Sequence, residues 1–180
     1  WLSLQMGRFF QQTDTRTLLQ RDIEARIPPG STILVQPYSV ALTQSREGLV
    51  EALTASLGHP GRASTKFALR LGLDPYPSPA YRTLYLGEGG LDADKIYLSY
   101  VELGGPAGLA RLRQHGVRFV VLKRYNVEDP AVVPLRALLA AHGTRLATVT
   151  PYRADASEAA RVRVAPFLHN TDTPWDPALE

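Results

Sequence analysis

Residues 95–123, KIYLSYVELGGPAGLARLRQHGVRFVVLK, decide the fold of this chain. The stretch begins with a short apolar run at 95–100 and ends with a β-branched run at 118–123, and both are typical of buried strands. Between them, the apolar residues of 107–115 recur at helical spacing. A strand, a helix and a second strand in this order form a right-handed unit whose strands lie parallel. The sequence therefore predicts an α/β fold.

The same alternation continues on both sides of this unit. Towards the C-terminus, the pattern predicts a helix over 132–142 and a strand over 145–151. Towards the N-terminus, it predicts a helix capped by Asp14, a strand over 31–37 and a second helix over 47–57. Helices that alternate with buried strands cover both faces of one sheet. We therefore expect a three-layer α/β/α sandwich with a mainly parallel, Rossmann-like sheet.

One region departs from the alternation of strand and helix. Residues 67–73 and 81–86 both alternate apolar with polar side chains, and they flank the proline-rich segment DPYPSP at 74–79. Period-two alternation around a turn-forming segment is typical of strands. The pattern predicts a β excursion or hairpin within residues 62–90.

The ends of two predicted helices carry a histidine followed by a glycine. Gly116 and Gly143 stand where a left-handed C-terminal cap needs a glycine. His115 and His142 precede them, and a histidine at this position complements the helix dipole. None of the four histidines of the chain lies in an HxxxH or HExxH spacing. We interpret His115 and His142 as helix-terminal residues, and we predict no metal site.

Length and composition indicate one globular domain. The chain has 180 residues, of which 44% are hydrophobic, and no apolar run approaches the roughly 20 residues of a membrane-spanning helix. We expect a lead-in at 1–13, a single α/β domain at 14–170 and a loop or tail at 171–180 that ends before a closing strand. The lead-in contains Trp1, Phe9 and Phe10. This aromatic start fits a membrane-proximal segment, and it fits a core-packing segment equally well.

Charge and cysteine content exclude several classes of function. The formal net charge is +3, and acidic residues interleave the arginines, so the sequence lacks the basic patch of a nucleic-acid-binding protein. The chain has no cysteine, which excludes disulfides, thiolate catalysis and zinc sites built on thiolates. Only three of the 20 basic residues are lysines, and the others are arginines. We interpret this preference for arginine as an effect of GC-rich codons and not as a dedicated anion site.

Catalytic and cofactor motifs are absent from the sequence. The glycines at 104–108 stand between a predicted strand and a predicted helix, but they match neither GxGxxG nor GxxxxGK[ST]. Asp92 and Asp94 resemble the paired carboxylates that hold a metal ion in some transferases. They stand before a strand, however, whereas open parallel sheets bind ligands beyond the carboxyl ends of their strands. Ser99 lies at the end of a predicted strand but is not part of a GxSxG elbow. We therefore predict no catalytic residue and no cofactor.

Polar and aromatic side chains gather after the predicted strands. The carboxyl ends of parallel strands lie at one edge of the sheet, so these residues share one rim. Aromatic rings stack on sugars, and Arg and Asn bind hydroxyl or phosphate groups. The same residues would also serve to cover the core edge or to pack against another part of the protein. The candidate substrate contacts are Tyr38, Tyr100, Glu102, Arg124, Tyr125, Asn126, Tyr152 and Arg153.

Three short stretches resemble a known family. They are Asp14-Thr15-Arg16, the segment IPPGSTI at 27–33, and GVRFVVLKRY at 116–125. They are similar to segments that follow the last membrane helix in bacterial protein-mannosyltransferase-like enzymes of the GT-C superfamily. This chain departs from the family pattern at Leu19, where alanine is usual, and at Asp22, where tryptophan is usual.

The resemblance implies a location and a role. Enzymes of this type, related to dolichyl-phosphate-mannose-protein mannosyltransferases, take a sugar from a polyprenyl-phosphate donor. Their essential acidic residue belongs to a loop that has no counterpart in this chain. The resemblance therefore implies a non-catalytic domain on the extracytoplasmic face of the membrane, partnered by the membrane-embedded portion of the same polypeptide and by a lipid-phosphate sugar or acceptor. Two alternatives stay open: a structural module that docks on a partner, and a free-standing α/β small-ligand-binding protein.

Overall fold

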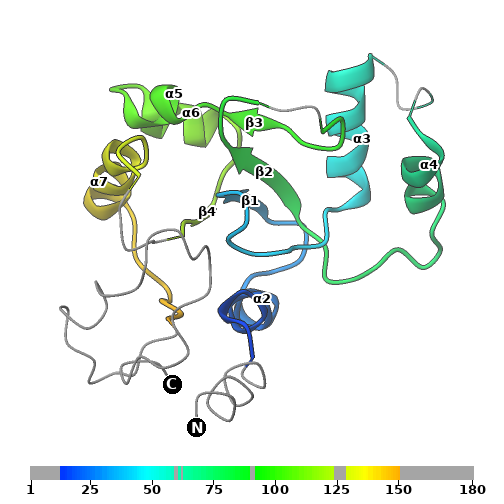
Figure 1. The fold of residues 1–180 in the computed structure, drawn as a ribbon, viewed down its shortest axis with the longest axis horizontal. Coiled ribbons are helices and arrows are strands. Elements are labelled where there is room, and N and C mark those ends of the chain that lie inside the picture. The colour runs from blue at the N-terminus through cyan, green and yellow to red at the C-terminus, as the bar shows by residue number, and fades with distance from the viewer. Residues whose placement is uncertain (1–12, 59–60, 62, 90–91, 124–128, 151–180) are drawn as a thin grey trace, which may run out of the picture.

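A computed structural model describes residues 13–58, 61, 63–89, 92–123 and 129–150, and its centre is a four-stranded sheet in which all strands are parallel (Figure 1). The spatial order is β3-β2-β1-β4. This is the order of the first four strands of a Rossmann sheet. From β1 to β3 the chain adds strands on one side of β1, and β4 is then added on the other side, so the strand order reverses between β1 and β4. The predicted α/β class and parallel sheet are confirmed. The strands are β1 (Thr32–Val35), β2 (Arg82–Leu86), β3 (Tyr97–Leu98) and β4 (Phe119–Val121).

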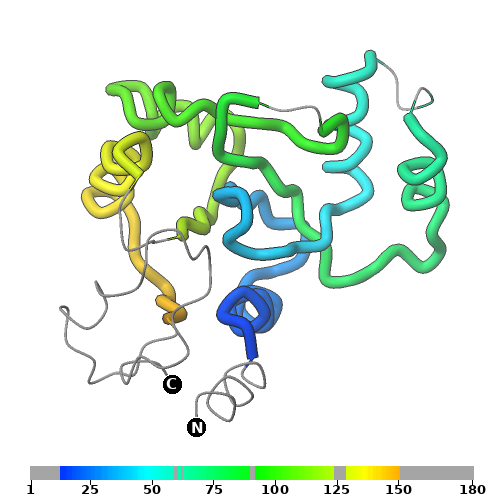
Figure 2. Tube along the Cα trace, viewed as in Figure 1, coloured from blue at the N-terminus to red at the C-terminus, as the bar shows by residue number. Residues whose placement is uncertain are grey.

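Helices lie on both sides of the sheet, as a three-layer sandwich requires. Figure 1 shows α2 below the sheet, and α5, α6 and α7 on the other side. The chain between β1 and β2 leaves the sheet to form α3 and α4 beside it, as the tube in Figure 2 shows. The helices are α2 (Thr15–Arg26), α3 (Arg46–Leu57), α4 (Thr65–Leu71), α5 (Tyr100–Gly104), α6 (Gly108–Gln114) and α7 (Val133–His142).

The two sheet faces carry separate hydrophobic clusters, because successive side chains of a strand point to opposite faces. On one face, Ile23 and Ile27 at the end of α2 pack against Ile33 and Val35 of β1. The other face packs against α5, α6 and α7. Its buried residues are Leu34, Leu84, Leu86, Leu98, Leu103, Leu112 and Leu135.

Local signals place the helix ends as predicted in most cases. The side chain of Asp14 accepts a hydrogen bond from the backbone N–H of Arg16 at the start of α2. Gly116 has φ +68°, so the residue after α6 has the left-handed conformation that glycine favours. Gly143 follows α7 with φ −120°, and the prediction of a left-handed cap there is wrong.

The predicted β excursion at 62–90 is wrong in its first half. Residues 65–71 form α4, because Phe67 and Leu71 are four residues apart and a helix places them on one side, while the intervening Leu69 is 69% exposed. The second half is a strand, but β2 pairs parallel with β1 and β3 and makes no hairpin.

Two further strand predictions need correction. The predicted strand at 95–100 shrinks to the two residues of β3, because Ser99 caps α5 by accepting a hydrogen bond from the backbone N–H of Val101. The predicted strand at 145–151 is not formed over 145–150, where the chain is mostly exposed and pairs with none of the four strands. A β-prone sequence forms a strand only when a neighbouring edge is available.

Candidate functional site

The carboxyl ends of β1 and β4 are joined by the side chain of Gln36. This residue follows β1 and is only 3% exposed. Its side-chain Oε1 accepts a hydrogen bond from the backbone N–H of Lys123 (2.9 Å). The backbone N–H of Gln36 donates to the carbonyl of Val121 (2.9 Å). Gln36 therefore fixes the two chain segments at the point where the strand order reverses. In open α/β sheets this is the position where ligands bind.

Tyr38 projects from this junction in a conformation that is rare for a side-chain-bearing residue. Its φ is +65° and the residue is 77% exposed. The turn is held by Ser39, whose hydroxyl donates to the Gln36 carbonyl (2.6 Å). The Nζ of Lys123 lies 5.4 Å from the centroid of the Tyr38 ring. An exposed aromatic ring with an ammonium beside it is thus presented at the rim, and a left-handed backbone outside glycine often marks a functional position.

The other half of the same edge carries an acidic group. Glu88 lies just beyond β2, and its Oε1 accepts from the hydroxyl of Ser99 (2.8 Å) and from the backbone N–H of Tyr100 (3.2 Å). These bonds tie the loop after β2 to the start of α5. The carboxyl edge therefore presents Tyr38 and Lys123 at the β1–β4 end and Glu88 at the β2–β3 end.

The structure places the predicted contact residues unequally. Tyr38 lies on the rim, as predicted. Tyr100 follows β3 as the first residue of α5 and is partly buried, with its side chain packed against the hydrophobic cluster. Glu102 is exposed but stands inside α5 and not on a loop after the strand. The remaining predicted contacts lie outside the described residues: Arg124, Tyr125, Asn126, Tyr152 and Arg153.

Three rim residues were not among the predicted contacts. The sequence signal for Gln36 is its position as the polar residue that directly follows the aliphatic run 33–35. Lys123 is the last residue of the strand predicted at 118–123, whereas β4 ends at Val121 and leaves Lys123 beyond it. Glu88 lies two residues beyond β2, in a region for which the sequence predicted a hairpin and no carboxyl edge of a parallel strand. Each of the three takes its role from a partner distant in sequence, which no local pattern reveals.

The first aspartate of the 92–94 triplet, Asp92, is bonded to side chains of the same protein. The carboxylate of Asp92 accepts hydrogen bonds from the Lys95 ammonium (2.9 Å) and the Tyr97 hydroxyl (3.1 Å), and the Lys95 bond in particular lowers its pKa. Among the residues that the structure describes, no three His, Asp or Glu side chains are grouped closely enough to hold a metal ion. The described rim residues offer an aromatic ring, an ammonium and a carboxylate as binding groups.

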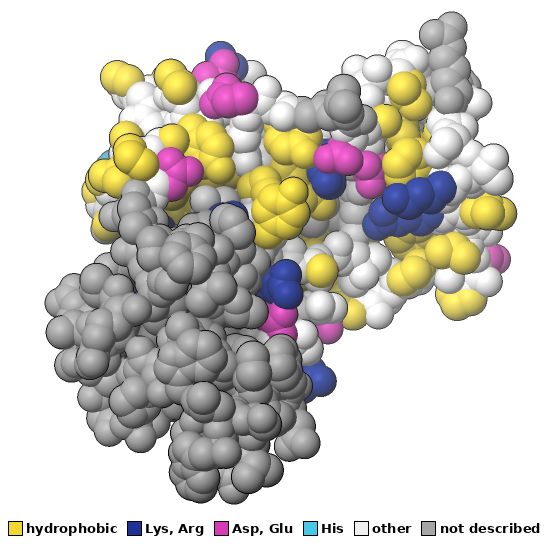
Figure 3. All heavy atoms as spheres, in the orientation of Figure 1, with side chains coloured by type: hydrophobic (Ala, Val, Ile, Leu, Met, Phe, Trp, Pro, Cys, Tyr) yellow, Lys and Arg dark blue, Asp and Glu magenta, His cyan; other side chains and the backbone are white. Residues whose placement is uncertain are grey.

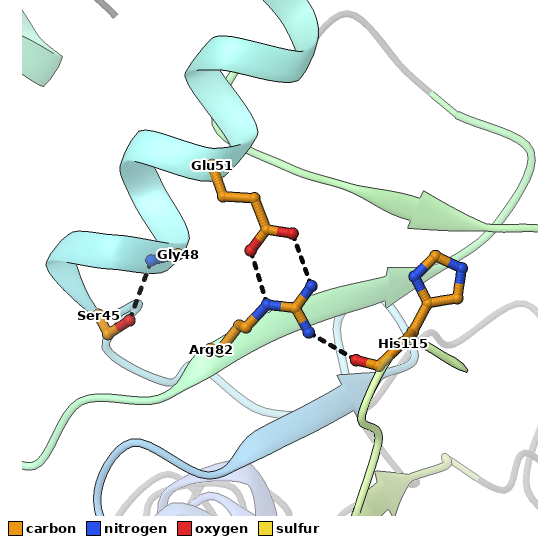
Figure 4. Close-up of polar contacts among 5 residues, drawn as sticks. All are labelled: Ser45, Gly48, Glu51, Arg82 and His115. Atoms are coloured by element: carbon orange, nitrogen blue, oxygen red, sulfur yellow. Dashed lines mark hydrogen bonds and ion pairs between the residues drawn. The ribbon is translucent and has the colours of Figure 1, made fainter. Parts of the chain in front are cut away.

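A third polar network lies at the amino half of β2 and is structural. The guanidinium of Arg82 binds the carboxylate of Glu51 on α3 through two hydrogen bonds and donates a third to the carbonyl of His115 at the end of α6 (2.7 Å), as Figure 4 shows. The hydrogen bonds from Arg82 hold the pKa of Glu51 below its usual range. These contacts link two helices to one strand.

The amino edge of the sheet also contains a shallow hollow of about 380 Å³ near the start of α3. Its one cationic group is already engaged within the protein, since the Arg46 guanidinium lies 5.2 Å from the Tyr76 ring centroid and donates to the Leu73 carbonyl. We therefore favour the carboxyl rim as the binding site. The hollow is lined by Pro29, Gly30, Ser45, Arg46, Glu47, Tyr76, Ser78 and Ala80.

Surface charge and helix length bear on the class of partner. On the face drawn in Figure 3, basic and acidic side chains are interspersed with hydrophobic ones, and no field of a single sign appears. Every helix within the described part of the chain is too short or too polar to cross a membrane. Comparison with protein-family models, with curated proteins and with solved structures found no match.

Proposed function

We propose that this chain is a non-catalytic accessory domain of a membrane glycosyltransferase that uses a polyprenyl-phosphate-linked sugar. In this proposal the domain lies on the extracytoplasmic face of the membrane and binds the sugar headgroup of the donor or the acceptor at its carboxyl rim. Two lines of argument support it. One is the resemblance of residues 14–16, 27–33 and 116–125 to GT-C enzymes. The other is the chemistry of the rim.

The exposed ring of Tyr38 is the single observation that carries the proposal. A sugar presents apolar C–H groups on its face and hydroxyls at its edge, so it stacks on an aromatic ring and bonds to polar groups beside it. The Lys123 ammonium, which lies 5.4 Å from the ring centroid, supplies a donor for a hydroxyl or a phosphate oxygen. The buried side-chain amide of Gln36 holds the backbone of Lys123, and the Gln36 carbonyl accepts from Ser39 in the turn that carries Tyr38.

Saturation-transfer NMR on the 180-residue chain tests the rim directly. The probes are mannose and mannose 1-phosphate, and inorganic phosphate serves as a competitor of mannose 1-phosphate. We expect signal transfer to the sugar protons of mannose 1-phosphate, lost in Tyr38→Ala and weakened in Lys123→Ala. Leu69→Ala is the matched control, because Leu69 is 69% exposed on α4, away from the rim. An equal response of Tyr38→Ala and Leu69→Ala would remove the rim from the proposal.

A second experiment concerns the parent protein. Alanine replacement of Arg124 and Tyr125 in the full-length enzyme is expected to lower sugar transfer. Both residues come directly after Lys123 in the sequence and are among the predicted substrate contacts. Unchanged transfer, together with loss of assembly when Tyr38 is replaced, would indicate a structural docking module instead. A parent gene without hydrophobic helices before Trp1 would overturn the membrane-enzyme assignment altogether.

A further inference from the structure

A pair of aromatic rings lies on strands β2 and β3 themselves. In the register of β2 and β3, Tyr85 stands opposite Tyr97, so both side chains point to the same face. Their ring centroids are 5.9 Å apart and the ring planes are inclined by 44°. The absence of a side chain at Gly87 leaves room for the Tyr97 ring, because a Cβ at residue 87 would lie only 3.3 Å from Cδ1 of that ring.

This part of the sheet face is not covered by α2. The cluster beneath α2 consists mainly of residues of β1, β4 and α2 themselves, including Ile33, Val121 and Ile23. Tyr85 and Tyr97 belong to neither hydrophobic cluster, and each is partly exposed. The half of the face formed by β2 and β3 therefore presents two tyrosine rings to the surroundings.

Two opposite charges stand at the edge of these rings. The Nζ of Lys95 lies 5.3 Å from the centroid of the Tyr85 ring and donates to Oδ2 of Asp92 (2.9 Å). The same oxygen accepts from the Tyr97 hydroxyl (3.1 Å). The side chain of Asp92 is 51% exposed, so its carboxylate is accessible. The patch formed by Tyr85, Asp92, Lys95 and Tyr97 thus combines aromatic rings, an acceptor and a donor without a net charge.

We propose that this patch, the Tyr85–Tyr97 platform, binds a neutral saccharide. The C–H face of a sugar stacks on a tyrosine ring, and its hydroxyls both donate to a carboxylate and accept from an ammonium. The inclination of the rings forms no parallel slot for a flat heteroaromatic ligand. The paired charges of Asp92 and Lys95 give no excess positive charge for a phosphate, which separates this platform from the rim beside Lys123.

A purely structural role for the same residues makes a different prediction. The bonds among Asp92, Lys95 and Tyr97 also close the loop that joins β2 to β3. If closure were their whole function, removal of the Tyr85 ring would change stability but no binding. The Tyr85 hydroxyl is not needed for stacking, so Tyr85→Phe separates the ring from its polar group.

The test is saturation-transfer NMR of the intact chain with neutral disaccharides of mannose, glucose or galactose. We expect binding of at least one disaccharide, retained in Tyr85→Phe and weakened roughly tenfold in Tyr85→Ala and in Asp92→Asn. Tyr76→Ala is the control, because Tyr76 also lies beneath a cation, the Arg46 guanidinium, but at the amino edge of the sheet. Thermal melts identify any variant that fails to fold.

The outcomes separate this platform from the rim. Loss of disaccharide binding in Tyr85→Ala with unchanged response to mannose 1-phosphate supports the platform, whatever Tyr38→Ala does to the rim. Absence of binding by every disaccharide overturns the platform proposal, and so does binding that is equal in the wild type, Tyr85→Ala and Asp92→Asn. Loss of mannose 1-phosphate binding in Tyr38→Ala alone bears only on the proposed function.

Discussion

Arg82 and Glu51 meet through two hydrogen bonds of 2.6 Å each, so that a strand in the sheet centre is tied to the helix α3 beside it. The third bond of the same guanidinium reaches the carbonyl of His115, which closes the last turn of α6. A positive charge at a helix C-terminus is favourable because the carbonyl groups there carry partial negative charge. One side chain therefore stabilises three elements that are distant in sequence.

Removal of this arginine is expected to destabilise the fold. Arg82→Met leaves Glu51 without its partner and the His115 carbonyl without its donor. Because the Arg82 and Glu51 side chains are 26% and 42% exposed, solvent screens the pair, and we expect a loss of about 1–2 kcal/mol in the free energy of unfolding. Urea denaturation checks this value. Arg70→Met on α4, which makes no ion pair or side-chain bond among the described residues, is the control and should change stability by less than about 0.5 kcal/mol.

The same pair predicts a pH dependence of stability. Hydrogen bonds from Arg82 lower the pKa of Glu51 in the folded protein, so the unfolded state binds more protons in the acidic range. The stabilisation is present above the unfolded pKa of about 4.3 and is lost as the pH falls towards the folded pKa. The difference in unfolding free energy between wild type and Glu51→Gln should therefore be constant from pH 6 to 8 and shrink below about pH 5. A difference that grows on acidification would contradict the ion pair.

Tyr38 should reveal a cost of its conformation. Tyr38→Ala and Tyr38→Gly both remove the ring and its contact with Lys123, but only glycine adopts φ +65° without strain. We expect the glycine variant to be more stable than the alanine variant by about 1 kcal/mol, measured by thermal or urea unfolding. Equal stability of the two variants would show that the backbone at residue 38 relaxes without the ring.

The two serine N-caps of α3 and α4 predict different effects of the same substitution. The hydroxyl of Ser45 accepts from the backbone N–H of Gly48 (3.1 Å), whereas Ser64 makes no side-chain capping bond. Ser45→Ala should therefore cost about 1 kcal/mol, and Ser64→Ala only a few tenths. Chemical denaturation of both variants under the same conditions measures the difference.

Gly108 stands where the chain passes too close for any side chain. A Cβ at this position would lie 2.0 Å from the carbonyl oxygen of Leu103 and 3.2 Å from the side chain of Leu138. Gly108→Ala is expected to lower stability by about 2–4 kcal/mol, since the backbone between α5 and α6 must move. Gly72→Ala provides the comparison, because its nearest neighbour would be 3.5 Å away, and it should be nearly neutral.

Some rim positions could be predicted from the sequence pattern and others could not. The position of Tyr38 after a buried strand was enough to place it at the carboxyl edge, because parallel strands all end there. The same pattern did not reveal that a helix starts at Tyr100, where the Glu88 carboxylate accepts from the Tyr100 backbone N–H and the Ser99 hydroxyl accepts from that of Val101. Both partners lie at positions that only the pairing of β2 with β3 brings together.

The sequence by itself determined the class of fold, most helix positions and the approximate positions of the four strands, because apolar periodicity and capping residues act within a few positions of the chain. Only the tertiary structure decided the rest. The choice between strand and helix at 65–71, the pairing of β2 inside the sheet and the absence of a strand over 145–150 all depend on whether a neighbouring surface or edge is available. The contacts of Gln36 with Lys123, and of Arg82 with Glu51, likewise join residues that are 87 and 31 positions apart. Such pairs arise from long-range packing, which no local pattern of residue types encodes.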